Sequence, residues 1–219
     1  MGGSSIYNAF WGKDPHNHEY RDPGPDDLRS PCPFLNALAN HVRVFTFYSI
    51  RNRDGRHITW LGATLAIRKI YNFSFFMAGL LSLSGWFTGL TQAWNPFWFD
   101  LKQLRIHKSY LIEHDASLSR EDWPGNNWEP NTQLIDALIS QASSPEGLSH
   151  EDFARHRVNQ EKKLNYKLSK PRHILATGEV GLVIPALGRG SDVPKEVRHH
   201  FLCFPLFFCS SDLILYPII

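Results

Sequence analysis

Apolar residues recur with the spacing of an α-helix in six segments of the chain. The segments predicted as helices on this basis span residues 34–41, 60–71, 75–83, 132–142, 150–164 and 178–187. Strand signals are weak, and β-prone residues gather mainly at 42–50. The pattern therefore predicts an all-α fold.

Turn and capping signals separate these helices. Loops are predicted at 123–127 and 143–147, which are rich in Pro, Gly, Asn and Ser. Ser149 follows the second loop and precedes Asp152 by three residues, which favours a helix cap at Ser149. The first 28 residues are polar and rich in Pro, Asp and His, so they are predicted to form an extended arm.

Composition agrees with a single domain. The chain has 219 residues, of which 42% are hydrophobic, and this suffices for a sizeable core. The net charge of +2 comes from dispersed residues, so nucleic acid is not an expected partner. The 3 cysteines are scattered and the 11 histidines are irregularly spaced, which indicates neither a disulfide framework nor a zinc site.

Residues 72–99 raise the question of a membrane span, because they contain no charged residue and are long enough to cross a bilayer. Three glycines, a proline and several polar residues interrupt them, so we do not expect a span there. The apolar C-terminal run is no better a candidate, since it contains two prolines and Asp212. The N-terminus lacks the apolar core of a secretory signal, so we expect an intracellular protein or an incomplete N-terminus.

Cys32 lies in the tetrapeptide Ser30-Pro31-Cys32-Pro33, directly before an apolar, helix-forming run. Proline fixes φ and lacks an N–H group, so the two prolines stiffen the turn, and Pro33 suits the first position of a helix. The free N–H groups at the start of that helix favour a thiolate, the form of cysteine that binds metals. Haem iron is one such partner. The alternative is a structural cysteine in a rigid turn.

A second group of polar residues occupies 112–122. Glu113 offers a hard anionic oxygen, and Ser117 would lie one helical turn later on the same face. His114 beside Asp115 could present an oriented imidazole. This combination is typical of one corner of a small cation site. The alternative is an ordinary helix start, with Asp115 or Ser117 as its cap.

Taken in this order, these elements resemble the haem-thiolate peroxidase family, which comprises the chloroperoxidases and the unspecific peroxygenases of fungi. The blocks that carry the resemblance are 27–41 around Cys32, Arg-Asp-Gly-Arg-His-Ile-Thr at 53–59, and Ile-Glu-His-Asp-Ala-Ser at 112–117. A less specific block, Thr-Gly-Glu-Val-Gly-Leu at 177–182, is similar to the Gly-Glu element of the family. The resemblance runs from about Tyr20 to about Arg198, and the length resembles the short branch of the family.

The resemblance implies a helical fold with haem b held between helices and Cys32 as the axial ligand of the haem iron. The thiolate would favour cleavage of the O–O bond of a bound peroxide. Glu179 would be the general acid–base residue, and His114 would orient it while Asp115 fixes the imidazole. An apolar pocket would raise the pKa of Glu179.

The resemblance also implies a magnesium ion, held by the side chains of Glu113 and Ser117, by the carbonyl of His114 and by a haem propionate. Ile112 and Leu182 occupy positions at which the family often carries pocket residues, so we expect both to contact the cofactor or the substrate. For Glu179 an alternative remains, because a single glutamate in an amphipathic helix is usually a solvated surface residue.

Two stretches depart from the family pattern. Residues 42–50 intervene behind the Cys32 helix, and the chain becomes unusually apolar after Arg198. We expect both to be non-family sequence, either translated intron or the product of an erroneous gene model. The expected organisation is an N-terminal arm at 1–28, a peroxidase-like domain at 29–198 and an atypical tail at 199–219.

The sequence therefore predicts an oxidoreductase that uses hydrogen peroxide to oxidise, oxygenate or halogenate small organic substrates, with haem as its cofactor. The alternative is a catalytically silent chain that binds haem without turnover or presents apolar surface to a partner or a membrane. Relatives of this kind are often exported. The sequence leaves the substrate and the oligomeric state open.

Overall fold

A computed structural model describes residues 22–40, 54–71, 73–108, 111, 113–187 and 192–193. Across these residues the chain is helical, which confirms the all-α prediction, and its only β contacts are two isolated bridges. The helices are α2 (Pro33–Asn40), α3 (Trp60–Tyr71), α4 (Phe75–Ala93), the short 3₁₀ helix η2 (Leu101–Arg105), α5 (Thr132–Ile139), α6 (His150–Lys163) and α7 (Lys170–Leu187). They belong to two compact units, which meet in sequence between Leu104 and Arg105.

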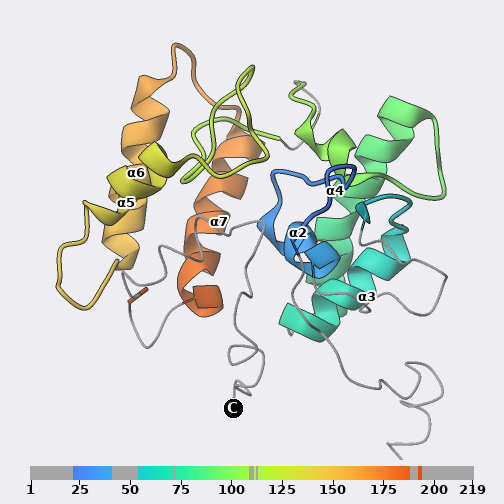
Figure 1. Cartoon of the computed structure of the whole chain (residues 1–219), viewed down its shortest axis with the longest axis horizontal. Coiled ribbons are helices and arrows are strands. Elements are labelled where there is room, and N and C mark those ends of the chain that lie inside the picture. The colour runs from blue at the N-terminus through green and yellow to red at the C-terminus, as the bar shows by residue number, and fades with distance from the viewer. Residues whose placement is uncertain are drawn as a thin grey trace, which may run out of the picture. The chain divides into compact units, whose positions relative to one another are not determined.

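The first unit is built around the pair α3 and α4, with α2 against α3 (Figure 1). Its core takes side chains from all three helices and from the segment after α4. Ile58 and Phe99 form an isolated antiparallel bridge through two backbone hydrogen bonds of 2.8 and 2.9 Å. This bridge places the fully buried Phe99 ring against α4.

Helix α4 extends to Ala93, whereas the sequence predicted an end at Leu83. The glycines interpreted as breaks instead make room for a neighbour, because Gly85 and Gly89 both lie against Phe99. Ser74 caps the start of the helix by accepting a hydrogen bond from the Met77 N–H at 3.2 Å.

One face of α4 carries exposed apolar side chains at helical spacing, namely Phe76, Leu80, Leu83 and Phe87. The described helices include none with the length and hydropathy that crossing a bilayer requires.

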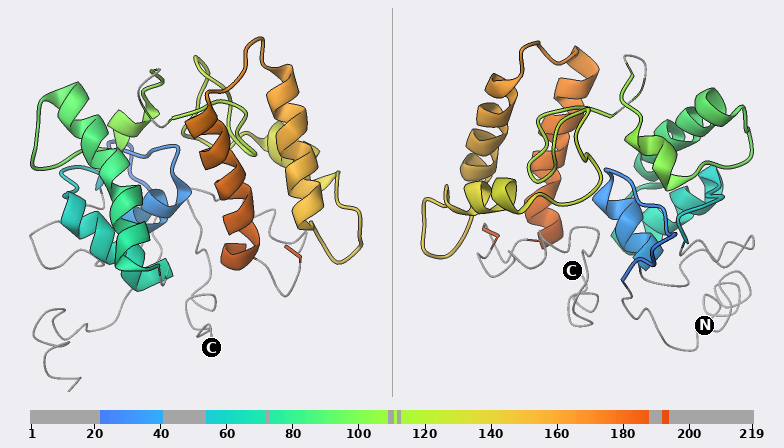
Figure 2. Two further views of the ribbon diagram at one scale, coloured as in Figure 1. Left: turned by 180° about the vertical axis from the view of Figure 1, so that it is seen from behind. Right: turned by 45° about the horizontal axis from the view of Figure 1, so that its top comes forward.

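The second unit contains α5, α6 and α7. Helices α6 and α7 lie side by side as an antiparallel pair joined by residues 164–169 (Figure 2). The predicted cap at Ser149 is confirmed, and it forms a complete capping box with Asp152.

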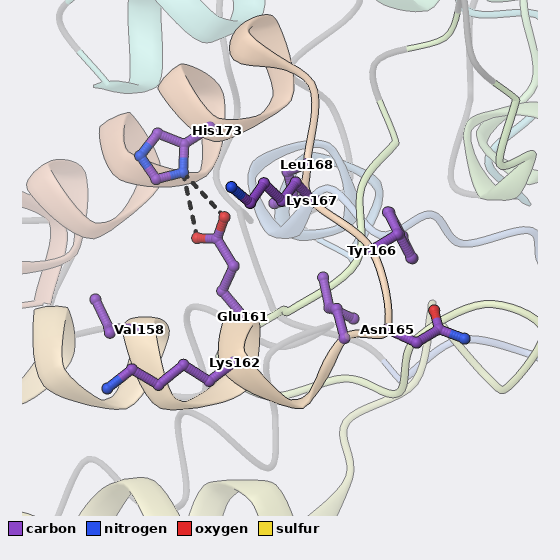
Figure 3. Close-up of a pocket in the computed structure, with 9 residues that line it drawn as sticks. Val158, Glu161, Lys162, Asn165, Tyr166, Lys167, Leu168 and His173 are labelled. Atoms are coloured by element: carbon purple, nitrogen blue, oxygen red, sulfur yellow. Dashed lines mark hydrogen bonds and ion pairs between the residues drawn. The ribbon is translucent and has the colours of Figure 1, made fainter.

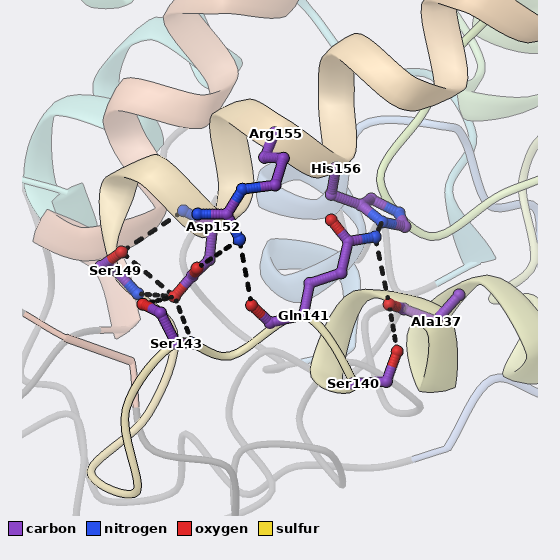
Figure 4. A network of polar contacts seen from close by, with 8 residues as sticks. All are labelled: Ala137, Ser140, Gln141, Ser143, Ser149, Asp152, Arg155 and His156. Atoms are coloured by element: carbon purple, nitrogen blue, oxygen red, sulfur yellow. Dashed lines mark hydrogen bonds and ion pairs between the residues drawn. The ribbon is translucent and has the colours of Figure 1, made fainter.

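Asp152 ties α6 to the loop before it (Figure 4). Its Oδ2 accepts hydrogen bonds from the backbone N–H and the hydroxyl of both Ser143 and Ser149, at 3.0 to 3.2 Å. Its Oδ1 faces the Arg155 guanidinium at 3.0 Å. Although burial alone raises the pKa of Asp152, these hydrogen bonds hold it at about 2.

The end of α5 and the start of α7 differ from the prediction. Helix α5 ends at Ile139, and a turn through Ser140 and Gln141 follows. Helix α7 begins at Lys170, eight residues before the predicted start, and it continues through Gly178. Pro171 lies in its first turn, where the missing N–H group costs no helical hydrogen bond.

Several predictions fall outside the described residues. These concern Ile112, the stretch 42–50, most of the N-terminal arm and the tail at 199–219. The described end of the arm, residues 22–28, contains no helix. The proposed domain boundaries stay a prediction.

Candidate active site

Cys32 directly precedes α2, and Pro33 occupies the first helical position as predicted. The Cys32 carbonyl accepts the first hydrogen bond of the helix from the Asn36 N–H at 3.2 Å. The cysteine forms no disulfide, and its side chain is partly buried against the core of the first unit. A partly accessible thiol at a fixed helix start is chemically able to bind a metal.

The turn before Cys32 is held by a clamp that sequence reasoning missed. The fully buried Asn36 side chain accepts from the Ser30 N–H at 2.8 Å and donates to the Ser30 carbonyl at 2.7 Å. The Ser30 hydroxyl in turn accepts from the Cys32 N–H at 3.2 Å. The rigidity expected from the two prolines is therefore supplemented by a side chain on the helix itself.

A second buried asparagine supports the same turn. Asn40 accepts from two nitrogens of Arg29, at 2.6 and 3.0 Å. Both asparagines lie in an apolar helical run, and a polar residue in such a run was the available signal for a structural role.

In the second unit, His114 and Glu179 lie together. His114 Nε2 is 3.3 Å from Glu179 Oε2, and the two residues come from the loop before α5 and from α7. The His114 side chain is only 7% exposed, whereas that of Glu179 is 52% exposed. His114 is therefore shielded from solvent, whereas Glu179 is accessible to it.

The charges of the pair support one another. Burial alone lowers the pKa of His114, but the hydrogen bond and the charge of Glu179 raise it to about 9. The carboxyl end of Glu179 lies against the His114 ring, and the loss of water there raises its pKa. The hydrogen bond and the charge of His114 outweigh this effect and lower the pKa of Glu179 overall. The expectation of a raised pKa at Glu179 is therefore wrong, because an imidazolium faces it.

Asp115 holds His114 through its backbone rather than through its carboxylate. His114 Nδ1 lies 2.9 Å from the Asp115 carbonyl oxygen. The Asp115 carboxylate instead accepts from the Trp123 N–H at 2.8 Å and from the Tyr166 hydroxyl. The expected support of the imidazole by Asp115 is present in this altered form.

The stretch 113–122 is a loop, so the expected helical face that joins Glu113 and Ser117 is wrong. Ala116 has a φ of 62°, which lies in the left-handed region and stops a helix there. The loop is cross-braced, since Asp122 accepts from the Ala116 N–H at 2.6 Å while Asp115 accepts from Trp123. Local side-chain contacts therefore replace regular structure.

Glu113 is a partly buried acid in this loop. Asn127 donates a hydrogen bond to its carboxyl group at 2.7 Å, and burial raises the pKa of Glu113 to about 8. The buried Asn127 Oδ1 has no hydrogen-bond partner. Within the ranges that the structure describes, no three His, Cys, Asp or Glu side chains gather into a metal site. The predicted magnesium set has a single carboxylate, so magnesium stays a proposal.

Arg172 of α7 binds Lys108 and Leu111 to the helix that also carries Glu179. Its guanidinium donates to the Leu111 carbonyl at 3.2 and 3.3 Å, and it also donates to the Lys108 carbonyl. Leu182, three residues after Glu179, is half-buried.

A pocket of about 600 Å³ lies at the junction of α6 and α7, where Tyr166 and Lys167 form part of its wall (Figure 3). Glu161 and His173 face each other across the two helices at 3.2 Å. Sequence reasoning missed Tyr166, Arg172 and Asn127, because their contacts join segments that no local pattern connects.

Comparison with known families gives a match over most of the chain. A family model described as "Peroxidase, family 2" matches residues 18–204. The chain therefore belongs to peroxidase family 2, the family of the fungal chloroperoxidases and haem-thiolate peroxidases. Membership indicates an oxidoreductase that acts on peroxide and suggests haem as the cofactor. No curated protein sequence matches the chain.

Proposed function

We propose that the protein is a haem-thiolate peroxidase or peroxygenase that uses hydrogen peroxide to oxidise, oxygenate or halogenate small organic molecules. The observation that carries the proposal is the pairing of a buried His114 with an accessible Glu179 at 3.3 Å, in a chain whose family is defined by peroxidases. Such a pair can hold and move a proton at one defined place.

Cys32 is the residue that would hold the haem iron. It lies on a turn held by hydrogen bonds of Asn36 and Ser30, and the N–H groups of α2 begin beside it. When bound, haem would supply the cleavage of the peroxide O–O bond and the oxidising equivalents. The backbone clamp of Asn36 keeps the thiol in place for this role.

Glu179 would act as the acid–base residue. Because its pKa is lowered by His114, the carboxylate is ionised at neutral pH and would accept a proton from a hydrogen peroxide molecule bound beside it. The resulting carboxylic acid would then give that proton to the other peroxide oxygen, which already carries one hydrogen and leaves as water when the O–O bond breaks. His114 would stabilise the ionised state of Glu179 and fix its orientation.

Glu113 and Ser117, with the carbonyl of His114, would contribute oxygen ligands to a magnesium ion. A partly buried carboxyl group with a raised pKa, such as Glu113, is a suitable ligand, because a divalent cation would compensate for the loss of water around it. Leu182 and Ile112 would line the substrate side of the cofactor.

An absorption spectrum of the purified, haemin-supplied protein tests the cofactor and its ligand. We expect the ferrous carbon monoxide complex to show the red-shifted Soret band of thiolate ligation. Cys32→Ala should abolish this band, whereas replacing both Cys203 and Cys209 with Ala should preserve it. A colourless protein, or a band that survives Cys32→Ala, would contradict the proposal.

A turnover assay tests the acid–base role. Glu179→Gln should keep the haem spectrum and lose peroxide turnover by about 10²-fold or more, as for removal of a general acid–base catalyst. Glu151→Gln, on an exposed position of α6, is the matched control and should retain turnover. A haem-loaded wild-type protein without turnover would favour the silent alternative.

A further inference from the structure

We infer that Tyr166 is a positioning residue for the His114–Glu179 pair: its hydroxyl fixes Asp115, and Asp115 fixes the imidazole. The functional meaning of this inference rests on the proposed function, but its structural content can be tested without turnover.

The orientation of His114 depends on the peptide group of Asp115. A carbonyl oxygen can only accept a hydrogen bond, so the contact of 2.9 Å between His114 Nδ1 and the Asp115 carbonyl places a proton on Nδ1. With Nδ1 so engaged, Nε2 is directed at Glu179. A rotation of the Asp115 backbone would release the ring from both partners.

The Asp115 carboxylate determines whether that backbone can rotate. The residue is buried, so its two oxygens need donors. One donor is the Trp123 N–H at 2.8 Å, which belongs to the same loop and moves with it. The other strong donor is the Tyr166 hydroxyl, which lies 51 residues away in the connection between α6 and α7. His107 Nε2 is more distant from this carboxylate, at 3.7 Å.

Tyr166 is therefore the link between Asp115 and the scaffold that carries Glu179. Helix α7 begins at Lys170, four residues after Tyr166, and it includes Glu179. The phenol thus sets the position of the loop relative to the helix on which the acid–base residue lies. Arg172 provides a second attachment, but it acts on the carbonyls of Lys108 and Leu111 and leaves the Asp115 peptide free.

The simplest alternative is that Tyr166 contributes only packing. The residue is 42% exposed and lines the pocket at the end of α6, so part of its ring is buried and could contribute packing (Figure 3). The replacement Tyr166→Phe keeps the ring and removes only the hydroxyl. A role in packing and a role in positioning therefore predict different results for this variant.

The test uses the full-length protein labelled with ¹⁵N-histidine and held as the diamagnetic ferrous carbon monoxide complex, or as purified if no haem binds. In the wild type we expect the His114 ring N–H protons to be observable and shifted downfield, because both are hydrogen-bonded. Tyr166→Phe should broaden or abolish the Nδ1–H signal while the protein stays folded and the haem spectrum is unchanged. Peroxide turnover should fall about ten- to a hundredfold, as expected for a misplaced catalytic group, with KM for the organic substrate unchanged.

Two further variants separate the outcomes. Thr177→Val removes a hydroxyl from α7 that donates only to the His173 carbonyl, and it should leave the ring signals and turnover unchanged. Tyr166→Gln restores an N–H donor without the ring, and it should recover part of the Nδ1–H signal.

An unchanged His114 signal in Tyr166→Phe would overturn the inference, whatever the activity. The same holds if neither variant folds, since the hydroxyl would then be needed for folding rather than for positioning. It also holds if Tyr166→Gln loses the signal as fully as Tyr166→Phe, since an N–H donor at this position would then make no difference. The Nδ1–H signal could be lost in Tyr166→Phe while the wild-type protein itself shows no peroxide turnover. This result would support the positioning role and contradict the proposed function.

Discussion

The side-chain amide of Asn36 forms two hydrogen bonds with the backbone of Ser30: it accepts one from the Ser30 N–H and donates one to the Ser30 carbonyl. The two residues are six positions apart in the sequence, and Cys32 lies between them. The first turn of α2 and the loop before it are thereby joined into one rigid corner, with the thiol at its centre. The corner is independent of any bound group, because its hydrogen bonds are all internal to the chain.

Replacing Asn36 with Leu should destabilise the protein and reduce haem binding. The Ser30 N–H and carbonyl would be left buried without partners, at a cost of about 1–3 kcal/mol for each group. Urea unfolding would measure the loss, and the haemin bound per chain would measure the effect on Cys32. Asn159→Ala, at an exposed position of α6, is the control. Unchanged unfolding of Asn36→Leu would show that the two prolines alone hold the turn.

Alanine substitutions along α4 should separate by position. A Cβ atom at Gly85 would lie 2.7 Å from the Phe99 ring, and one at Gly89 would lie 2.6 Å from the Phe99 Cβ. Each change should lower the free energy of unfolding by about 1–3 kcal/mol, the usual cost of overpacking. Gly79→Ala meets its nearest side-chain atom at 3.6 Å and should stabilise the helix by about 0.5–1 kcal/mol.

Thermal midpoints of the three variants provide the comparison. A gain in stability at Gly85 equal to that at Gly79 would mean that Phe99 does not press against α4.

Asp152 should make the protein sensitive to strong acid. Its pKa is about 2 in the folded chain against an ordinary value of 3.8, so its contribution is present above pH 3.8 and is lost as pH falls through about 2. The shift corresponds to about 2 kcal/mol. Asp152→Asn should lower stability by about this amount at neutral pH and should flatten the acid part of the stability profile. Denaturant midpoints between pH 2 and 5 measure both effects, and a parallel profile for the variant would contradict the assignment.

His156 should produce a second, milder pH dependence. The residue is fully buried between Gln141 and the Leu118 carbonyl, and burial lowers its pKa from 6.5. Its neutral form is favoured by folding, so stability should decline as pH falls below 6.5 and through the lowered pKa. His156→Gln should remove this part of the pH dependence, whereas His150→Gln, at an exposed position of the same helix, should keep it. The fluorescence-monitored unfolding midpoint from pH 7 to 5 is the measurement.

Helix positions were predictable where local signals act alone. The start of α3 at Trp60, the capping box at Ser149 and the length of α6 all follow from residues close in sequence. The end of α4 was not predictable, because its glycines are explained by Phe99, a residue that lies outside the helix. The loop around Ala116 was mistaken for a possible helix start, since the carboxylates that hold its left-handed turn lie on both sides of it.

The candidate site was predictable through motifs rather than through geometry. The sequence blocks pointed to His114 and Glu179, and the structure brings these two side chains together. Tyr166 and Arg172 carry no such signal, because they contact residues 51 and 61–64 positions away. The sign of the pKa shift at Glu179 was also out of reach, since it depends on the charge of His114 at contact distance.

Arg172 and Glu179 are seven residues apart, about two turns along the same helix. Arg172 binds the Leu111 carbonyl, and Glu179 contacts the imidazole of His114, which follows Leu111 by three residues. A thermal tilt of α7 therefore carries both attachment points in the same direction. The distance between Glu179 and His114 therefore depends on one helix. It changes less during fluctuations of the surrounding fold than it would if Arg172 and Glu179 belonged to different helices.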